Sequence, residues 1–252
     1  MLEPVPGRIR YTELDALRGI AIVMMVLFHL VFDLSFFSLF QVDTNHGFWR
    51  IFGYATASLF VLIAGAAVAL RAGRIPSTTR GVAVMLPFMK RGLLLIGVGF
   101  LVTVGTYLFL AGNGYVLFGI LHLIGASTIL APLFFRLEKK VIIPGVLIVL
   151  AGWLLTIPFG PVYLLWIGIH PPGYYSVDYT PLIPWFGVFL IGMAWGFWWY
   201  PNGSRSFRVS PWCEKILRIP ALPGRHSLLI YLLHQPILLV LLSLAFGKIP
   251  GI

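Results

Sequence analysis

Long apolar segments follow one another along almost the whole chain, and they restrict its fold more than any other feature. Each segment is about 19 to 27 residues long, enough for a helix to cross a hydrocarbon core of about 30 Å. A backbone that faces lipid must satisfy its own hydrogen bonds, so the segments predict an all-α, polytopic transmembrane bundle. We expect about seven spans: Leu14–Phe40, Ile51–Leu70, Gly92–Ala111, Tyr115–Phe135, Val141–Phe159, Leu182–Tyr200 and Ser227–Phe246.

The composition excludes a soluble protein. Of the 252 residues, 59% are apolar and only 10% are charged. No soluble insert separates the spans, which predicts a single transmembrane domain over residues 1–252, and residues 1–12 hold no apolar core of a removable signal peptide. The single cysteine, Cys213, rules out an internal disulfide and a multi-thiolate metal site, and we expect no metal.

The net charge of +10 is a topology signal rather than a sign of nucleic-acid binding. With seven spans, all but Arg50 and Lys248 of the 18 basic residues fall on one side. The positive-inside rule then places the amino terminus in the cytoplasm and the carboxyl terminus outside. The apolar piece Val162–Ile169 is too short to span, and we interpret it as a re-entrant or interfacial part of an outer loop.

Four ionisable residues lie along one side of the first predicted span. On a helix, Arg18 and His29 nearly eclipse each other, and Asp15 and Asp33 lie about 40° to either side of His29. Ionisable side chains inside a membrane usually face a bundle interior or a wet cavity, because they are costly in hydrocarbon. The stripe therefore predicts a functional cavity.

Within this stripe, each group has a catalytic interpretation and a structural one. Asp33 is four residues after His29 and can orient the imidazole as a general base, whereas the alternative is a polar pair that fixes helix packing. Arg18 can hold a phosphate or carboxylate, or it can anchor the inner end of the span by pairing with Asp15.

Two further histidines lie inside predicted spans. His122 occupies the fourth span, and His234 precedes Gln235 and Pro236 near the middle of the last one. A single intramembrane histidine often forms an interhelical hydrogen bond, but three at comparable depth favour one shared cavity with His29.

Basic side chains on the inner side are candidates for binding a phosphate-rich cofactor from the cytosol. Positive-inside topology alone would explain most of them. They are Arg71, Arg74, Arg80, Lys90, Arg91 and, at the inner mouth of the last span, Arg225. On the outer side, His46 beside Asp43 is a second candidate base, and the aromatic connection Gly160–Pro181 suits sugar rings.

The sequence also resembles known transmembrane acyltransferases. Arg18 followed by His29 after ten residues is similar to the Arg-x10-His signature of the acyltransferase-3 family. Other stretches resemble more closely the catalytic domain of the heparan-α-glucosaminide N-acetyltransferase family and its small prokaryotic relatives. These stretches are Phe60–Gly65, Gly119–Gly125, Asp178–Trp185 and His226–Pro236.

The resemblance implies an enzyme that moves acetyl from cytosolic acetyl-CoA to a hydroxyl or amine of a sugar or glycolipid across the membrane. It also implies a prokaryotic cytoplasmic membrane, with membrane lipid around the protein. His29 matches the motif histidine, but heparan-type enzymes have their proposed histidine nearer His46, so both stay open as the base. In such a transfer, His122 or His234 is expected to steady the oxyanion. Direct transfer and an acetyl-histidine intermediate stay open too, as does a homo-oligomer.

Two other classes of function compete with the acyltransferase. Intramembrane histidine and aspartate also suit a proton-coupled transporter or exporter. However, the chain shows no pair of related halves with matching broken helices, which many such transporters have. A purely structural membrane subunit would leave the stripe of four ionisable residues unexplained.

Overall fold

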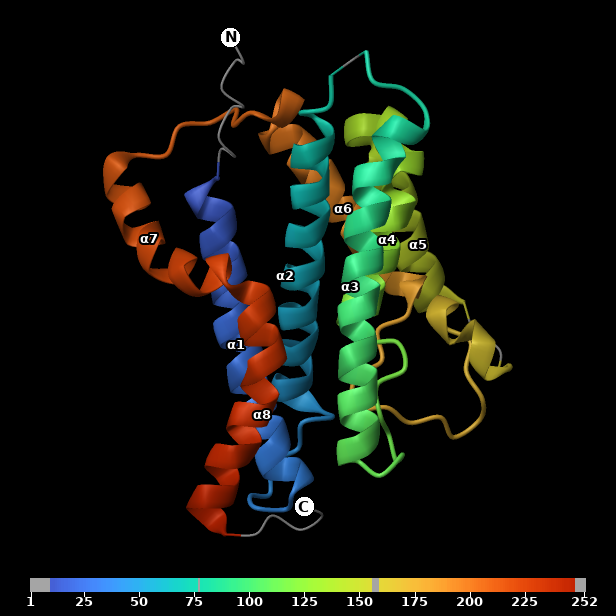
Figure 1. The fold of residues 1–252 in the computed structure, drawn as a ribbon, viewed down its shortest axis with the longest axis vertical. Helices are drawn as coiled ribbons and strands as arrows, with labels where there is room; N and C mark the ends of the chain where they lie inside the picture. The colour runs from blue at the N-terminus through green and yellow to red at the C-terminus, as the bar shows by residue number, and fades with distance from the viewer. Residues whose placement is uncertain (1–9, 77, 156–158, 248–252) are drawn as a thin grey trace. The chain divides into compact units, whose positions relative to one another are not determined.

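The computed structural model describes residues 10–76, 78–155 and 159–247, and its regular elements within these ranges are all helices (Figure 1). The residues group into two compact units. The first combines the described residues up to Leu59 with Arg208–Gly247, and the second holds the described residues of Phe60–Phe207. The two ends of the sequence therefore build one unit together.

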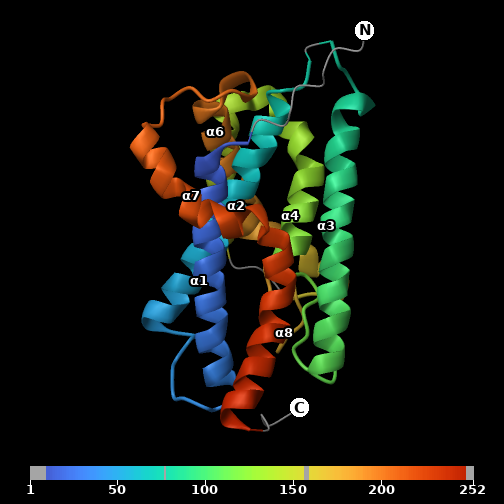
Figure 2. The same cartoon turned by 60° about the vertical axis from the view of Figure 1, so that its left-hand side comes forward.

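The first unit is organised around its amino-terminal helix. Its elements are α1 (Thr12–Phe36), the first half of α2 (Gly47–Ala72), α7 (Pro211–Arg225) and α8 (Ser227–Phe246). Helix α1 packs against both α7 and α8, and α8 runs beside the later turns of α1 (Figure 2). Near the ends of α1 and α8, Phe37 and Leu242 are buried against a cluster of leucines. Apolar packing thus closes this end of the pair.

Two glycines let α1 and α7 touch backbone to backbone. A Cβ atom added to Gly19 would overlap the carbonyl oxygen of Pro220, and one added to Gly224 would overlap that of Asp15. Only glycine leaves room for so close an approach. The crossing therefore fixes α7 beside the first turns of α1.

The second unit holds the remaining helices. They are the second half of α2, α3 (Val82–Phe109), α4 (Ile120–Leu130), η1 (Ala131–Val141), α5 (Ile142–Leu154), η2 (Val162–Ile167), α6 (Leu182–Trp199) and η3 (Pro201–Gly203). Helix α3 packs on α4, and α5 packs on α6. Gly65 of α2 is pressed against the backbone of α6, where a Cβ would overlap the carbonyl oxygen of Phe189. Small residues therefore allow close helix packing inside this unit.

The prediction of an all-α protein with several membrane-length helices is confirmed. Within the described residues, six helical segments are long and apolar enough to span a membrane. One of them, Ile120–Leu154, covers two of the expected seven spans, and its backbone breaks at Glu138, where φ is 46° and ψ is −124°. The count of seven and the orientation of the termini stay predictions. Residues 156–158 of the expected fifth span lie outside the described residues.

Several boundaries differ from those expected. Helix α3 begins at Val82 rather than Gly92, so Lys90 and Arg91 lie within a helix and not in a connection. Lysine and arginine are good helix formers, so α3 continues through them and begins before the apolar run does. Helix α4 begins at Ile120 rather than Tyr115.

Two elements between the spans also bear on the expectations. The piece predicted over Val162–Ile169 forms the six-residue 3₁₀ helix η2, about 12 Å long and too short to span. Helix α7 lies between the expected spans Leu182–Tyr200 and Ser227–Phe246, where the sequence predicts no element. Its two prolines, Pro220 and Pro223, hid its helical character in the sequence.

Candidate functional site

A polar quartet lies between α1 and α8 in the first unit. It consists of His29 and Asp33 from α1 and His234 and Gln235 from α8. The side chain of Gln235 donates a hydrogen bond from Nε2 to Asp33 Oδ1 at 2.8 Å. The imidazole rings of His29 and His234 meet edge to face, with centroids 4.9 Å apart. Two histidines from opposite ends of the sequence, both predicted site residues, are therefore neighbours.

The surroundings of His234 identify which ring nitrogen carries the hydrogen. Its Nδ1 lies 2.7 Å from the carbonyl oxygen of Tyr231, which can only accept a hydrogen bond. The neutral ring therefore has its hydrogen on Nδ1 and a lone pair on Nε2. That Nε2 is buried and has no hydrogen-bond partner among the described residues. This tautomer suits proton acceptance better than the oxyanion stabilisation that we expected of His234.

The hydrogen bond expected between Asp33 and His29 is replaced by a different one. Asp33 is 2% exposed, and one of its oxygens accepts from Gln235, while His29 Nδ1 has no hydrogen-bond partner in the part of the chain that the structure describes. Asp33 therefore bonds to an amide on the facing helix α8 and not to the histidine four positions before it on α1. Gln235 was not among the predicted site residues, and only its position next to His234 could have indicated it.

Arg18 lies at the other end of α1. It pairs with Asp15, as the structural interpretation of Arg18 expected. Its Nη1 donates to Asp15 Oδ1 at 2.8 Å. Arg225 of α7 approaches the second oxygen of the same carboxylate, with its Nε 3.9 Å from Asp15 Oδ2. Two guanidinium groups thus approach one buried carboxylate. Both arginines belong to the first unit.

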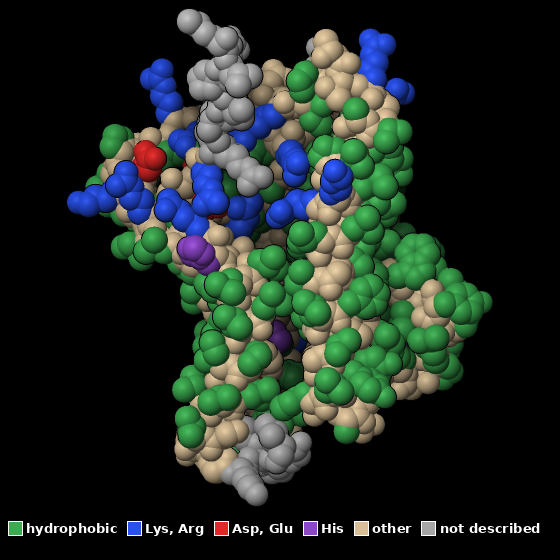
Figure 3. All heavy atoms as spheres, in the orientation of Figure 1, with side chains coloured by type: hydrophobic (Ala, Val, Ile, Leu, Met, Phe, Trp, Pro, Cys, Tyr) green, Lys and Arg blue, Asp and Glu red, His purple; other side chains and the backbone are tan. Residues whose placement is uncertain are grey.

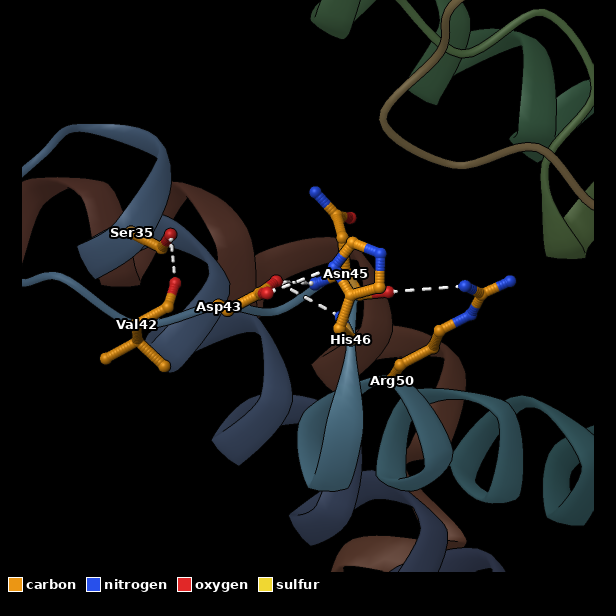
Figure 4. A network of polar contacts seen from close by, with 6 residues as sticks. All are labelled: Ser35, Val42, Asp43, Asn45, His46 and Arg50. Atoms are coloured by element: carbon orange, nitrogen blue, oxygen red, sulfur yellow. Dashed lines mark hydrogen bonds and ion pairs between the residues drawn. The ribbon is translucent and has the colours of Figure 1, made fainter.

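A second polar cluster lies in the connection between α1 and α2 (Figure 4). The carboxylate of Asp43 accepts hydrogen bonds from the backbone N–H groups of Asn45 at 2.9 Å and His46 at 3.1 Å. Its other oxygen, Oδ2, lies 3.0 Å from Nδ1 of the His46 ring. Asp43 therefore holds both the backbone at the start of α2 and the imidazole of His46.

This pair has the arrangement that a general base requires. The backbone N–H of Asn45, followed by the His46 ring and its N–H, lowers the pKa of Asp43 below its ordinary value. A carboxylate that stays ionised accepts from Nδ1–H and leaves Nε2 of His46 with its lone pair. The His46 side chain is 77% exposed, so a substrate can reach that nitrogen. Asp43 was noted beside His46 in the sequence but was not predicted as a site residue.

His122 lies in the second unit, in the first turn of α4 rather than deep inside a span. Its ring packs edge to face on Phe100 at 5.1 Å and lies 5.6 Å from Phe118. Gly99 makes room for it, since a Cβ there would come within 2.8 Å of the ring. These contacts fit a role of the His122 ring in helix packing. The shared cavity of His122 with His29 and His234 stays a prediction.

The start of α4 is held by Asp178, which was not among the predicted site residues. Asp178 Oδ2 accepts from the backbone N–H of Ile120 at 3.1 Å, and the backbone N–H of Thr180 donates to the carbonyl of Phe118. These bonds satisfy the segment before Ile120 without a helix and explain the late start of α4. Burial raises the pKa of Asp178 from 3.8 to about 6, although the Ile120 hydrogen bond opposes the shift.

The predicted donor-binding cations of the second unit lie at its surface. Arg71 is placed over the ring of Phe88, 5.6 Å from its centroid, and Arg74 Nε donates to the carbonyl oxygen of Gly203 at 3.1 Å. Arg80, Lys90 and Arg91 are exposed as well. No group of three or more histidine, cysteine, aspartate or glutamate side chains that could hold a metal occurs among the described residues.

Comparison with protein families decides the relationship of this chain. The catalytic-domain family described as heparan-alpha-glucosaminide N-acetyltransferase matches residues 10–236. The chain belongs to this family. Membership implies a transferase, and the apolar helices place that transferase in a membrane. Comparison with curated proteins and with solved structures finds no match.

Proposed function

We propose that this protein transfers an acetyl group from cytosolic acetyl-CoA to a hydroxyl or amine on the opposite side of the membrane. A sugar or a lipid-linked sugar is the proposed acceptor. The family match over residues 10–236 supports the reaction. The bias of basic residues toward one side supports the direction of transfer. The transporter alternative gains no support from the family match.

The proton acceptor in this proposal is His46, oriented by Asp43. The observation that carries it is the 3.0 Å contact between His46 Nδ1 and Asp43 Oδ2, on a ring that is otherwise exposed. His46 Nε2 takes the proton of the acceptor group, whose oxygen or nitrogen attacks the thioester carbonyl. The carbon–sulfur bond breaks, CoA leaves as the thiolate, and the proton held on His46 Nε2 passes to this thiolate to give the thiol.

The intramembrane quartet is the second place where the proton can be taken. The unpartnered Nε2 of His234, with His29 beside it at 4.9 Å, is supported as a base by its fixed tautomer. Of the two sites, the quartet is the one closer to the prediction of His29 as an intramembrane general base. In the proposal the quartet lines the route of the thioester through the membrane, and His234 acts as base only if His46 does not.

Donor binding is assigned to the basic residues near the predicted inner side. Phosphates of acetyl-CoA match guanidinium and ammonium groups, which bind them through charge-assisted hydrogen bonds. In the second unit the candidates are Arg71, Arg74, Arg80, Lys90 and Arg91, and in the first unit they are Arg18 and Arg225. We expect Arg18 to contribute least, because its guanidinium is already paired with Asp15.

The test is acetyl transfer by the purified protein in lipid nanodiscs, with labelled acetyl-CoA and a panel of amino and hydroxyl sugars. His46→Ala lowers transfer by about 100-fold or more if His46 is the base. Asp43→Asn keeps an oxygen for both backbone hydrogen bonds but removes the charge. We therefore expect it to lower transfer at least about tenfold with an unchanged melting temperature.

Variants of the quartet complete the design. If His46→Ala and Asp43→Asn retain full activity while His234→Ala is inactive, the base is His234 and the assignment to His46 is wrong. If no acetyl transfer occurs with any acceptor and well-folded protein binds no acetyl-CoA in calorimetric titration, the proposed function itself fails.

A further inference from the structure

Helix α7 has three distinct faces, and among the described residues of the first unit one face packs on α1. Its buried residues, Ala221 and Gly224, face α1 at the glycine crossing. On the far side, Trp212 is 71% exposed and Ile219 is 74% exposed, with Ile216 between them. At about 100° per residue these three side chains fall within about 60° of one another. They form an apolar stripe that no described part of the first unit covers.

A basic flank borders this stripe. Lys215 and Arg218 are exposed and lie about 60° and 120° around the helix from Trp212. Lys and Arg side chains gather around α7 in the space-filling view, next to apolar ones (Figure 3). The helix begins with a capped turn, in which Ser210 Oγ accepts from the backbone N–H of Cys213 at 3.2 Å. An apolar stripe beside a basic flank is the pattern of helices that lie in a membrane interface.

The position of α7 in the first unit matches this pattern. The glycine crossing places it beside Asp15 and Gly19, where the apolar part of α1 begins and its charged end lies. The surface of the cytoplasmic leaflet carries anionic lipid, which attracts basic side chains close to the membrane. The basic flank and the apolar stripe of α7 therefore both complement an anionic lipid surface.

We propose that α7 lies in the headgroup layer of an anionic leaflet, with Trp212, Ile216 and Ile219 inserted among acyl chains and with Lys215 and Arg218 on lipid phosphates. Through the glycine crossing, this contact holds the charged end of α1 at a fixed depth. The proposal does not depend on the acetyl-transfer reaction, so it stands or fails separately from the proposed function.

Cys213 allows a test in the unaltered chain, because it is exposed and is the only cysteine. We would label it with an environment-sensitive fluorophore and reconstitute the protein in bilayers of phosphatidylcholine with or without 30% phosphatidylglycerol. We expect a blue shift of the emission with the anionic lipid, and we expect the shift to shrink at high salt. Identical spectra in both bilayers would overturn the proposal.

Depth is measured with single spin labels in a Cys213→Ser background. A label at Ile219→Cys should be accessible to oxygen and shielded from a water-soluble nickel chelate, and one at Arg218→Cys should show the reverse. A label at position 219 that is accessible to the chelate places the stripe in water. Shielding from both reagents means that protein, such as a second copy of the chain, covers it. Either result contradicts a lipid contact.

The contribution of charge is tested with matched double variants. Lys215→Gln with Arg218→Gln should abolish most of the effect of phosphatidylglycerol on the label at Cys213. The control, Lys139→Gln with Lys140→Gln, removes the same charge from exposed positions of the second unit and should leave the effect intact. Equal losses in both would show a general charge effect. Unchanged lipid contact together with weakened acetyl-CoA binding in the α7 variant would reassign the basic flank to the donor.

Discussion

Asp33 is a carboxylate held almost entirely out of water, and its hydrogen bond comes from an amide 202 positions later in the chain. A buried charge that loses its partner carries the full cost of its removal from water. The bond between Asp33 and Gln235 therefore joins α1 to α8 more firmly than the same pair would on a surface.

We predict that Gln235→Leu lowers the stability of the protein by about 1–3 kcal/mol, because Asp33 is left without its donor. For a chain of this size that corresponds to a fall of about 2–10 °C in the apparent melting temperature. Thermal unfolding in detergent checks it. The double variant Asp33→Leu, Gln235→Leu should recover most of the loss, and a double variant as unstable as Gln235→Leu would contradict this explanation.

Asp178 gives a prediction about pH at the scale of an element, since it caps α4. Its pKa in the folded protein is about 6, above its ordinary value of 3.8, so the folded state holds the proton more tightly. The stability that this group contributes is complete below pH 4 and is lost as the pH rises to about 6. The loss is at most about 3 kcal/mol.

Replacing Asp178 with Asn keeps the acceptor for the Ile120 N–H but removes the charge. We therefore expect Asp178→Asn to be more stable than the unaltered protein at pH 7.5 and equally stable near pH 4. Melting temperatures across this range check the expectation. A variant that is less stable at pH 7.5 would show that the charge favours the helix start, as a carboxylate at a helix N-terminus can.

The crossing of α1 and α7 gives a prediction about packing. Gly224→Ala puts a methyl group into the backbone of Asp15 and should destabilise the first unit by about 1–3 kcal/mol. The matched control is Gly97→Ala on α3, where a Cβ meets nothing within 4 Å. That control should be neutral or slightly stabilising, because alanine is the better helix former. Equal melting temperatures for the two variants would contradict the close approach at Gly224.

The helices and the site differ in how far the sequence could predict them. The apolar runs predicted α1, α2, α6 and α8 well, because a membrane span must be both long and apolar. They missed α7, whose apolar residues are interrupted by prolines and charges. They also missed the Asp178 cap, because a contact between Asp178 and Ile120 leaves no local pattern.

Within the site, the residue types were predictable but their partners were not. The stripe on α1 predicted a site at His29 and Asp33, and the structure places the ring of His29 against that of His234. The choice of Gln235 over His29 as the partner of Asp33 depends on how α8 packs on α1. Spacing along one helix carries no information about that.

At the scale of the whole molecule, the charge bias predicts that the α1–α2 connection and α7 lie on opposite sides of the membrane. A membrane-impermeant maleimide should label Cys213 only in inside-out vesicles. In a Cys213→Ser background, Asn45→Cys should be labelled only from the outside. Asn45 is a suitable site because it is exposed and its backbone, not its side chain, bonds to Asp43. Labelling of both positions from one side would refute the predicted topology.

The first unit is made of the two ends of the chain, and this has a consequence for its synthesis. Helix α1 leaves the ribosome early, whereas α7 and α8 follow only after the whole second unit has been made. At roughly 5–20 residues per second, the delay between Asp33 and Gln235 is about 10–40 s. During that time α1 must reside in the insertion machinery or the bilayer, and the Asp33 carboxylate lacks the hydrogen bond from Gln235. Biogenesis of this protein therefore depends on protecting the polar helix α1 until α8 has been made.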